Sequence, residues 1–294
     1  MTTKKQNLLE IEYSESLKTI METYQEIAAT RMQRIKSRVL GSRDFLLEIN
    51  TLFQQVKSSY KKEVDALVKK KKLKDPSKLR FIKHNGKTIF IFISANTGLY
   101  GDIIRRTFEL FAKAIRKEIG DAAIIGRLGV RLFQEEFGFA KPFAYFDLPD
   151  NKIDQESLKK IIPYLIQYEN ALVFYQQFQN VISYQPIITS VSGDKLPMQE
   201  SDSGINPFDK LSIKYFFEPS LGMAMAFFEK EIFASIFEQT VFESHLAKFS
   251  SRMVALDKAT ENIQDSLKQM MRQKERIKHQ AINKEQNERL SSMR

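Results

Sequence analysis

Apolar residues recur along the C-terminal part of the chain at alternating steps of three and four. They form one row, broken by polar residues at only two positions: Leu246, Phe249, Met253, Leu256, Thr260, Ile263, Leu267, Met270, Lys274, Ile277 and Ala281. This is the heptad spacing of a coiled coil. A shorter row near the N-terminus has similar spacing: Leu17, Ile20, Tyr24, Ile27, Ala28, Met32, Ile35 and Val39. The rows predict a long amphipathic helix at each end of the chain. The two helices could pair antiparallel or join an ordinary helix-bundle core.

Helix-breaking residues are confined to the middle of the chain. All 8 prolines lie between Pro76 and Pro219, and every glycine except Gly41 lies between Gly86 and Gly222. A proline inside a helix costs about 3 kcal/mol and a glycine about 1 kcal/mol. Residues 1–75 and 223–294 are therefore predicted to be mostly helical. The second of these would reach roughly 100 Å at about 1.5 Å per residue, so much of it must project from any compact domain.

The middle of the chain has a different pattern. A strand is predicted over Lys87–Ser94, a β-branched and aromatic run between two turn sequences, and a helix over Asp102–Ile119. Short apolar runs or strand-like alternation follow at Ala122–Ile125, Val130–Phe133, Val181–Ser192 and Leu211–Phe217, with loops expected at Phe146–Gln155 and Gly193–Asp209. A strand, a glycine-rich turn, a helix and a second strand are typical of an α/β layer with parallel pairing.

Charge and composition narrow the possible functions. The chain has 294 residues and a net charge of +10, most of it in residues 61–83 around the run Lys69–Lys74. Such a run can bind nucleic acid or anionic headgroups, although it is more often a solvated loop, and no aromatic platform accompanies it. No apolar run approaches the roughly 18 residues of a membrane span, and the N-terminus is too polar for a secretory signal.

The sequence carries no recognisable catalytic or cofactor site. There is no cysteine, and His84, His245 and His279 are scattered, which argues against a metal centre. Asn85–Thr88 ends like a phosphate-binding loop, but the opening glycine is missing and a strand follows where a helix is required. The turn Thr97–Asp102 lacks the dinucleotide-binding glycine pattern. We therefore predict neither catalysis nor a bound cofactor.

Three segments, in order along the chain, resemble the gamma subunit of F-type ATP synthases. They are Ile27–Met32 in the N-terminal helix, Ile93–Gly101 after the first strand, and Ser251–Asn262 (SRMVALDKATEN), which is the most specific match. The resemblance implies an α/β fold class, with a long antiparallel coiled coil of the terminal helices and a central Rossmann-like α/β domain. The implied domains are residues 1–78 (helix and basic connector), 79–210 (α/β domain) and 211–294 (last strand and C-terminal helix).

The resemblance also implies a function. The chain would be a non-catalytic rotor shaft that couples rotation to ATP hydrolysis or synthesis in a surrounding hexamer of alpha- and beta-type subunits. An epsilon-type subunit and a membrane c-ring would be further partners, with no nucleic acid, no cofactor and no direct membrane insertion. The location implied is cytoplasmic, peripheral to the inner face of the cell membrane.

Site residues follow from the matching positions of the family motifs. The partner-binding candidates are Glu26, Ile27, Arg31, Met32, Arg252, Met253, Asp257, Thr260, Asn262, Lys278, His279 and Asn283. Arg252 matches a family arginine that meets a loop of the beta subunit. Thr260 could equally be a polar residue that sets the register of the coiled coil without binding a partner. Arg31 and Met32 could equally be an ordinary surface residue and an ordinary seam residue.

Alternatives remain open at this point. Acidic residues (Glu10, Glu12 and Glu15) stand where the family has a basic helix start, which also fits a gamma-like shaft of an F-type-like ATPase that is not coupled to protons. Two other hypotheses remain: an unrelated coiled-coil scaffold, and a protein that binds nucleic acid through Lys69–Lys74. Co-purification with two ATPase-type subunits would separate them.

Overall fold

The computed structural model describes residues 4–60, 81–139, 141–150, 153, 155–180, 183–192, 218 and 220–292. The run Lys69–Lys74, the loop expected over Gly193–Asp209 and the strand expected over Leu211–Phe217 lie outside these residues.

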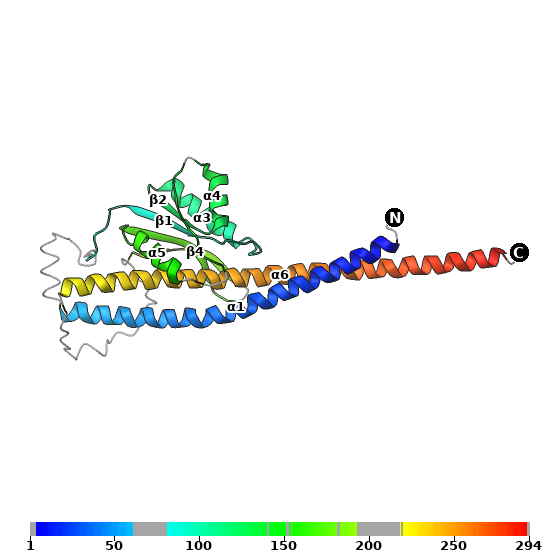
Figure 1. Ribbon diagram of the computed structural model, residues 1–294, viewed down its shortest axis with the longest axis horizontal. Coiled ribbons are helices and arrows are strands. Elements are labelled where there is room, and N and C mark those ends of the chain that lie inside the picture. Colours follow the sequence, from blue (N-terminus) through cyan, green and yellow to red (C-terminus); the bar gives the residue numbers. More distant parts are fainter. Residues whose placement is uncertain are drawn as a thin grey trace.

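Two helices of unusual length run the length of the molecule. Helix α1 (Lys4–Ser59) has 56 residues and α6 (Leu221–Ser292) has 72. They lie side by side and antiparallel, and α6 extends beyond the start of α1, so both chain ends lie at the same free end (Figure 1). The predictions of two terminal helices, of their antiparallel pairing and of a projecting C-terminal end are confirmed.

A five-stranded sheet with three helices sits against the half of the coiled coil away from the free end (Figure 1). The strands are β1 (Thr88–Ile93), β2 (Asp121–Ile125), β3 (Ala144–Phe146), β4 (Asn170–Phe178) and β5 (Tyr184–Ser190), in the order β3-β2-β1-β4-β5. The helices are α3 (Ile103–Lys117), α4 (Arg127–Phe137) and α5 (Gln155–Leu165). Among these five strands, only β4 and β5 pair antiparallel. The predicted parallel α/β layer is confirmed.

Both faces of the sheet are buried, which explains why β1 is apolar at almost every position. Phe90 and Phe92 pack with α3 and α4 on one face, while Ile89, Ile91 and Ile93 face the other, which α5 and α6 cover. Strand side chains alternate between faces, so a strand between two helical layers needs apolar residues on each. Helix α6 is therefore part of the core of the α/β domain as well as one strand of the coiled coil.

Several details differ from expectation. The apolar run Val130–Phe133 lies within α4, and the sequence pattern did not indicate β3, β4 or α5. Strand β4 contains Gln176 and Gln177, which break the apolar pattern although Gln176 is fully buried. The strand-like alternation of Val181–Ser192 does form β5, whose Pro186 is tolerated because β5 is an edge strand.

The coiled-coil seam on α1 also differs from the predicted row. Buried and half-buried residues follow one uninterrupted heptad pattern: Asn7, Ile11, Ser14, Lys18, Met21, Gln25, Ala28, Met32, Ile35, Val39, Ser42, Leu46, Ile49, Phe53 and Val56. Ile20, Tyr24 and Ile27 are instead 48%, 46% and 40% exposed. The predicted row crossed between two stripes at Ile27–Ala28, because adjacent helix residues point about 100° apart. On α6, Lys274 and Ala281 are exposed, so the predicted row does not stay buried to its end.

Candidate partner interface

The middle of α6 is enclosed on all sides. Every residue from position 240 to position 252 is buried, including eight with polar or charged side chains, such as Glu243, Lys248 and Arg252. Helix α1 covers one side of this segment and the sheet covers the other. A buried polar group is costly unless it is hydrogen-bonded, so these side chains must find partners within the fold.

Three residues of α6 bind the turn that follows β1. The ammonium Nζ of Lys248 donates to the carbonyl of Ser94 at 2.8 Å, and the Ser251 hydroxyl donates to the carbonyl of Tyr100 at 2.6 Å. The Arg252 guanidinium donates to Thr97 Oγ1 at 3.1 Å and to the carbonyl of Gly98 at 2.8 Å. These contacts fix the turn to the helix over residues 94–100.

The carboxylate of Asp150 also binds this turn. Its Oδ2 accepts hydrogen bonds from the backbone N–H groups of Asn96 and Thr97, at 2.9 and 2.8 Å, and from the Thr97 hydroxyl. Its Oδ1 lies 3.8 Å from Lys248 Nζ, and both side chains are almost fully buried. Asp150 therefore both neutralises the buried Lys248 ammonium and orders the turn.

This arrangement closes the crevice where related α/β folds bind ligands. In open parallel sheets, ligands bind at the carboxyl ends of the strands, next to the point where the strand order reverses. Here β1 ends at that point, and Lys248 and Arg252 of α6 occupy the space beyond it. The guanidinium of Arg252 also lies 4.0 Å above the ring of Tyr100. The chain fills its own crevice with side chains from the coiled coil.

The turn holds Leu99 in an unusual conformation. Leu99 has a φ of 67°, in the left-handed region that side chains other than glycine rarely adopt, and it is 55% exposed. Such a conformation costs of order 1–3 kcal/mol and persists only where the surrounding structure enforces it. The contacts from Arg252, Ser251 and Asp150 on either side supply that enforcement.

Burial shifts the proton affinities in this region. Burial lowers the pKa of Lys248 to about 8, with Arg252 adding to the effect and Asp150 opposing it. Burial also lowers the pKa of His245 well below its usual value, and it raises the pKa of Tyr100. His245 is thus held in the neutral form inside the junction between helix and sheet.

A second polar contact joins α1, α6 and the sheet. The carboxylate of Glu243 on α6 accepts hydrogen bonds from Arg43 Nη2 of α1 at 2.6 Å and from the Tyr175 hydroxyl of β4 at 3.3 Å. Nearby, the Ser244 hydroxyl donates to Gln176 at 2.6 Å. Rotation of either helix about its axis would break these bonds, so the coiled coil and the α/β domain form one mechanical unit.

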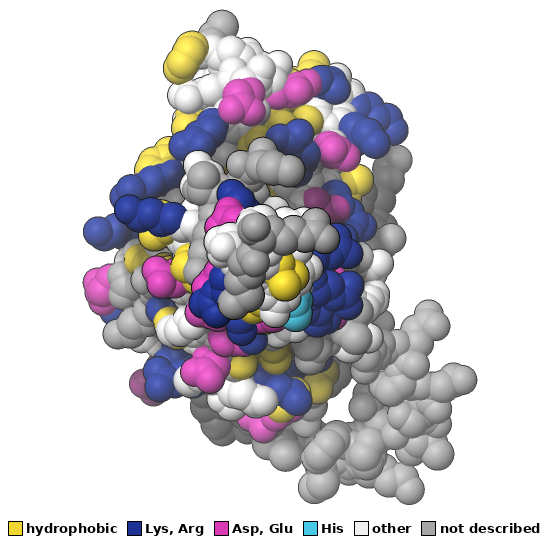
Figure 2. Space-filling view, turned by 90° about the vertical axis from the view of Figure 1, so that its right-hand side faces the viewer, with side chains coloured by type: hydrophobic (Ala, Val, Ile, Leu, Met, Phe, Trp, Pro, Cys, Tyr) yellow, Lys and Arg dark blue, Asp and Glu magenta, His cyan; other side chains and the backbone are white. Residues whose placement is uncertain are grey.

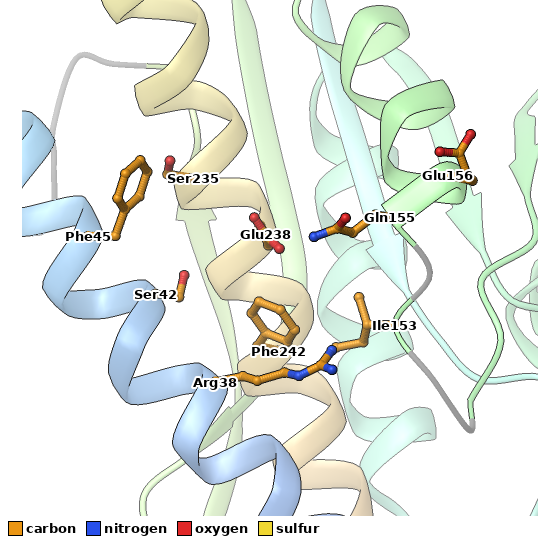
Figure 3. Close-up of a pocket in the computed structure, with 9 residues that line it drawn as sticks. All are labelled: Arg38, Ser42, Phe45, Ile153, Gln155, Glu156, Ser235, Glu238 and Phe242. Atoms are coloured by element: carbon orange, nitrogen blue, oxygen red, sulfur yellow. The ribbon is translucent and has the colours of Figure 1, made fainter.

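A cavity of about 650 Å³ lies between α1, α5 and α6 (Figure 3). Its wall includes Arg38 from α1, Gln155 and Glu156 at the start of α5, and Glu238 and Phe242 from α6. Burial raises the pKa of Glu238, and Arg38 opposes that shift. One cation, two carboxylates and aromatic side chains form no recognisable cradle for phosphate or for a metal ion.

The predicted partner-binding residues fall into two groups. Glu26, Ile27, Asp257, Asn262, Lys278, His279 and Asn283 are exposed, and the others are buried or half-buried. Arg252 is only 8% exposed and engaged with the turn of its own chain, and Thr260 lies in the seam with its hydroxyl unpartnered. Asp257 accepts a long hydrogen bond, 3.3 Å, from Gln25 of α1.

The free end of the molecule is a single helix. All of α6 from residue 278 to residue 292 is exposed, including Lys278, His279 and Asn283. Figure 2 looks along the coiled coil from this end and shows charged side chains gathered around the tip of α6. No other described part of the chain buries this segment.

Sequence reasoning missed Lys248, Asp150, Glu243 and Arg43. A short polar sequence such as Glu243–Lys248 looks solvent-exposed, and only the enclosure of α6 on all sides would have indicated otherwise. Within the described ranges there is no group of histidine, aspartate or glutamate side chains arranged to hold a metal ion. None of the described helices has an apolar stretch of the length and character that crossing a membrane requires.

Comparisons with known proteins agree with this geometry. A family model described as ATP synthase matches residues 8–293. The chain is 21% identical to the ATP synthase gamma chain of Pelotomaculum thermopropionicum over 278 residues, which cover 92% of this chain and 90% of that protein. It is 25% identical to the ATP synthase gamma chain of Mycoplasma mobile over 251 residues, which cover 80% of this chain and 79% of that protein.

The fold also matches solved structures. A chain of the central stalk and c-ring of the mitochondrial ATP synthase of Tetrahymena thermophila aligns with a TM-score of 0.57 and 17% identity, covering 82% of this chain and 99% of that one. A chain of the Euglena gracilis mitochondrial ATP synthase aligns with a TM-score of 0.50 and 11% identity, covering 90% of this chain and 94% of that one. At these identities the likeness is one of fold.

Proposed function

This chain belongs to the ATP synthase family as a gamma chain, the central-stalk rotor subunit of an F-type ATP synthase, and we propose that it acts there as a non-catalytic shaft. Its family membership removes the alternative of an unrelated coiled-coil scaffold. The observation that carries the proposal is α6, which is enclosed from residue 240 to residue 252 and free from residue 278 onwards. Such a helix can transmit torque between a domain at one end and a partner at the other.

The proposed partner at the free end is a hexamer of alpha- and beta-type ATPase subunits. Surrounding subunits that are chemically alike would each meet a different side of an asymmetric shaft. A contact that is stronger in one conformation of a subunit shifts its population toward that conformation. Turning the shaft would therefore move each catalytic subunit in sequence through its open and closed states without any chemistry on the shaft itself.

We propose that the exposed candidates touch the hexamer directly: Glu26, Ile27, Asp257, Asn262, Lys278, His279 and Asn283. The buried and half-buried candidates would act through the coiled coil instead. Met32, Met253 and Thr260 would set the packing of the two helices, Arg31 lies 5.9 Å from the ring of Phe249, and Arg252 positions the turn around Leu99. We propose that Leu99, which is 55% exposed in this turn, is a further contact residue, one that the motif comparison did not identify.

The opposite end carries the remaining proposed contacts. There the end of α1 and the start of α6 lie beside the α/β domain (Figure 1). The solved stalk from Tetrahymena is described together with a c-ring. We propose that this end meets a membrane c-ring and an epsilon-type subunit, which would place the chain at the inner face of the cell membrane.

Reconstitution tests the proposal. The tagged chain should purify with two ATPase-type subunits, each in threefold excess over it, and ATP turnover should appear only in that assembly. Recovery of the chain alone, or only with RNA that high salt releases, would overturn the proposal.

The isolated chain should neither bind nor hydrolyse ATP. The crevice at the carboxyl ends of the strands is filled by Lys248 and Arg252, and no phosphate cradle is present among the described residues. Isothermal calorimetry with Mg-ATP should give no heat beyond dilution. Saturable binding at one nucleotide per chain would contradict this expectation.

Charge reversal at Glu26 should slow ATP turnover of the reconstituted complex. Glu26→Lys is expected to reduce the steady-state rate more than Glu26→Ala, because it adds repulsion where alanine only removes attraction. Arg252→Ala should also reduce the rate, since it releases the turn that carries Leu99, but it should not dissolve the complex. Wild-type rates in both Glu26→Lys and Arg252→Ala would show that these positions do not contribute to coupling.

A further inference from the structure

The cavity between α1, α5 and α6 lies where the coiled coil meets the start of α5 (Figure 3). Two helix faces form its walls: residues 38, 42 and 45 of α1 and residues 235, 238 and 242 of α6, each spaced by steps of three and four. Gln155 and Glu156, at the start of α5, line the third side. The volume of about 650 Å³ is within the range of small-ligand sites, which is roughly 300–1,000 Å³.

Two opposite charges face this cavity without being paired. Glu238 is half-buried, yet no hydrogen bond or ion pair joins its carboxylate to any described residue. Arg38 is exposed, and its guanidinium likewise has no ion pair within the described part of the chain. Burial raises the pKa of Glu238 although the charge of Arg38 opposes the shift. The carboxylate therefore lacks the close cation that a charge removed from water requires.

An apolar surface separates the two charges. In Figure 3 the Glu238 carboxylate and the Arg38 guanidinium lie on opposite sides of the ring of Phe242. Phe242 is only 6% exposed, whereas Phe45 on the α1 wall is 49% exposed. The cavity thus has a negative end, a positive end and aromatic side chains in its walls.

We propose that this cavity binds a short zwitterion of dipeptide size, with its ammonium group at Glu238, its carboxylate at Arg38 and its apolar middle against Phe45 and Phe242. A dipeptide carries its two charges at opposite ends. A free amino acid carries both on one carbon, so it does not reach partners on opposite sides of a ring. Binding would give each protein charge the counter-ion it lacks, through charge-assisted hydrogen bonds roughly twice as strong as neutral ones. A phosphate or a metal ion would satisfy only one of the two charges.

An occupant of this cavity would touch three helices at once. Arg38 and Phe45 belong to α1, Glu238 and Phe242 belong to α6, and Gln155 begins α5. A ligand that binds the folded chain and not the unfolded chain stabilises the folded state by mass action. The melting temperature should therefore rise with ligand concentration. The site is separate from the contacts proposed for the shaft, so its failure would leave the proposed function intact.

Matched dipeptide probes test the two charge assignments. Leucyl-leucine carries both charges, its C-terminal amide keeps only the ammonium group, and its N-acetyl derivative keeps only the carboxylate. Leucyl-leucine should raise the melting temperature of the full-length chain saturably, and isothermal calorimetry should give one site per chain. Each singly charged probe should bind at least about tenfold more weakly. Equal affinities for the three probes, or no saturable binding of leucyl-leucine, would overturn the proposal.

Neutral substitutions assign each end of the cavity. Glu238→Gln should weaken leucyl-leucine binding at least about tenfold and leave the affinity for the N-acetyl probe unchanged. Arg38→Gln should weaken leucyl-leucine binding to a similar extent and leave the affinity for the amide probe unchanged. Lys36→Gln is the control, because Lys36 is exposed two residues away on another face of α1, and it should bind like wild type. Wild-type affinity in Glu238→Gln or in Arg38→Gln would contradict the assignment.

Stability without ligand separates this site from a structural ion pair. Glu238→Gln removes a half-buried carboxylate that has no partner among the described residues, so the free chain should be at least as stable as wild type. Thermal unfolding measured by circular dichroism gives the comparison. A clear loss of stability in Glu238→Gln would mean that the carboxylate pairs within the fold, and the ligand assignment would then be wrong.

Discussion

Replacing Leu256 with aspartate is expected to separate the two helices along their free half. Leu256 is 2% exposed in the seam of α6, where α1 covers it. The change loses about 1.5–3 kcal/mol of apolar burial and adds the larger cost of a buried charge without a partner. The sum is a large part of the 5–15 kcal/mol by which a typical domain is stable. Circular dichroism should show lower helix content and a lower melting temperature, and assembly with the hexamer should fail.

The control for this change is Lys258→Asp, two residues further along α6 at an exposed position. It introduces the same side chain on the same helix but leaves it in water, so its stability should stay within about 0.5 kcal/mol of wild type. If both variants melt at the wild-type temperature and assemble normally, Leu256 is not in a packed seam and the coiled-coil geometry is wrong there.

Removal of the Asp150 carboxylate is expected to release the α/β domain from α6. Asp150→Ala leaves the backbone N–H groups of Asn96 and Thr97 without their acceptor and leaves the Lys248 ammonium without its counter-ion. Breaking a buried pair by removing one partner typically costs about 3–5 kcal/mol. Asp150→Asn keeps an acceptor oxygen and should cost clearly less. Denaturant unfolding measures the free energy of unfolding of both variants. If Asp150→Ala is as stable as wild type, the Asp150 carboxylate does not stabilise the contact between the α/β domain and α6.

The pH dependence of stability gives an independent readout of the same pair. Burial lowers the pKa of Lys248 to about 8 from an ordinary value of 10.5. Between these values the unfolded chain binds the proton and the folded chain does not, so this group makes stability rise with pH across that window. Asp150 holds the pKa up, so the rise should begin at lower pH in Asp150→Ala. In Lys248→Met the rise should disappear, and its persistence there would assign it to another group.

The sequence by itself determined the long elements of this protein. The absence of proline and, apart from Gly41, of glycine over both ends determined α1 and α6, because a single breaker is costly anywhere in a helix. The heptad row of α6 was placed correctly as far as Met270, since its apolar positions are spaced for one partner. The first strand and the glycine-rich turn after it could also be predicted, because a β-branched run between turn residues is compatible with few structures other than a strand.

Only the tertiary structure decided which face of each helix packs in the seam and which face stays exposed. On α1 two apolar stripes lie side by side, and nothing in local spacing says that Ala28 belongs to the seam while Ile27 remains exposed. Strand β4 escaped notice because Gln176 is polar, yet its amide is satisfied by the carbonyl of Ile93 and by Thr107.

The site residues depended most on tertiary contacts. Arg252 and Lys248 bind atoms about 150 residues away in sequence, and Asp150 comes from a third segment. A periodic pattern records the burial of one segment against whatever covers it, whereas a buried polar pair requires two distant segments to meet in a particular register. For that reason the sequence defined the shaft, and the folded chain alone defined how the shaft is held by its domain.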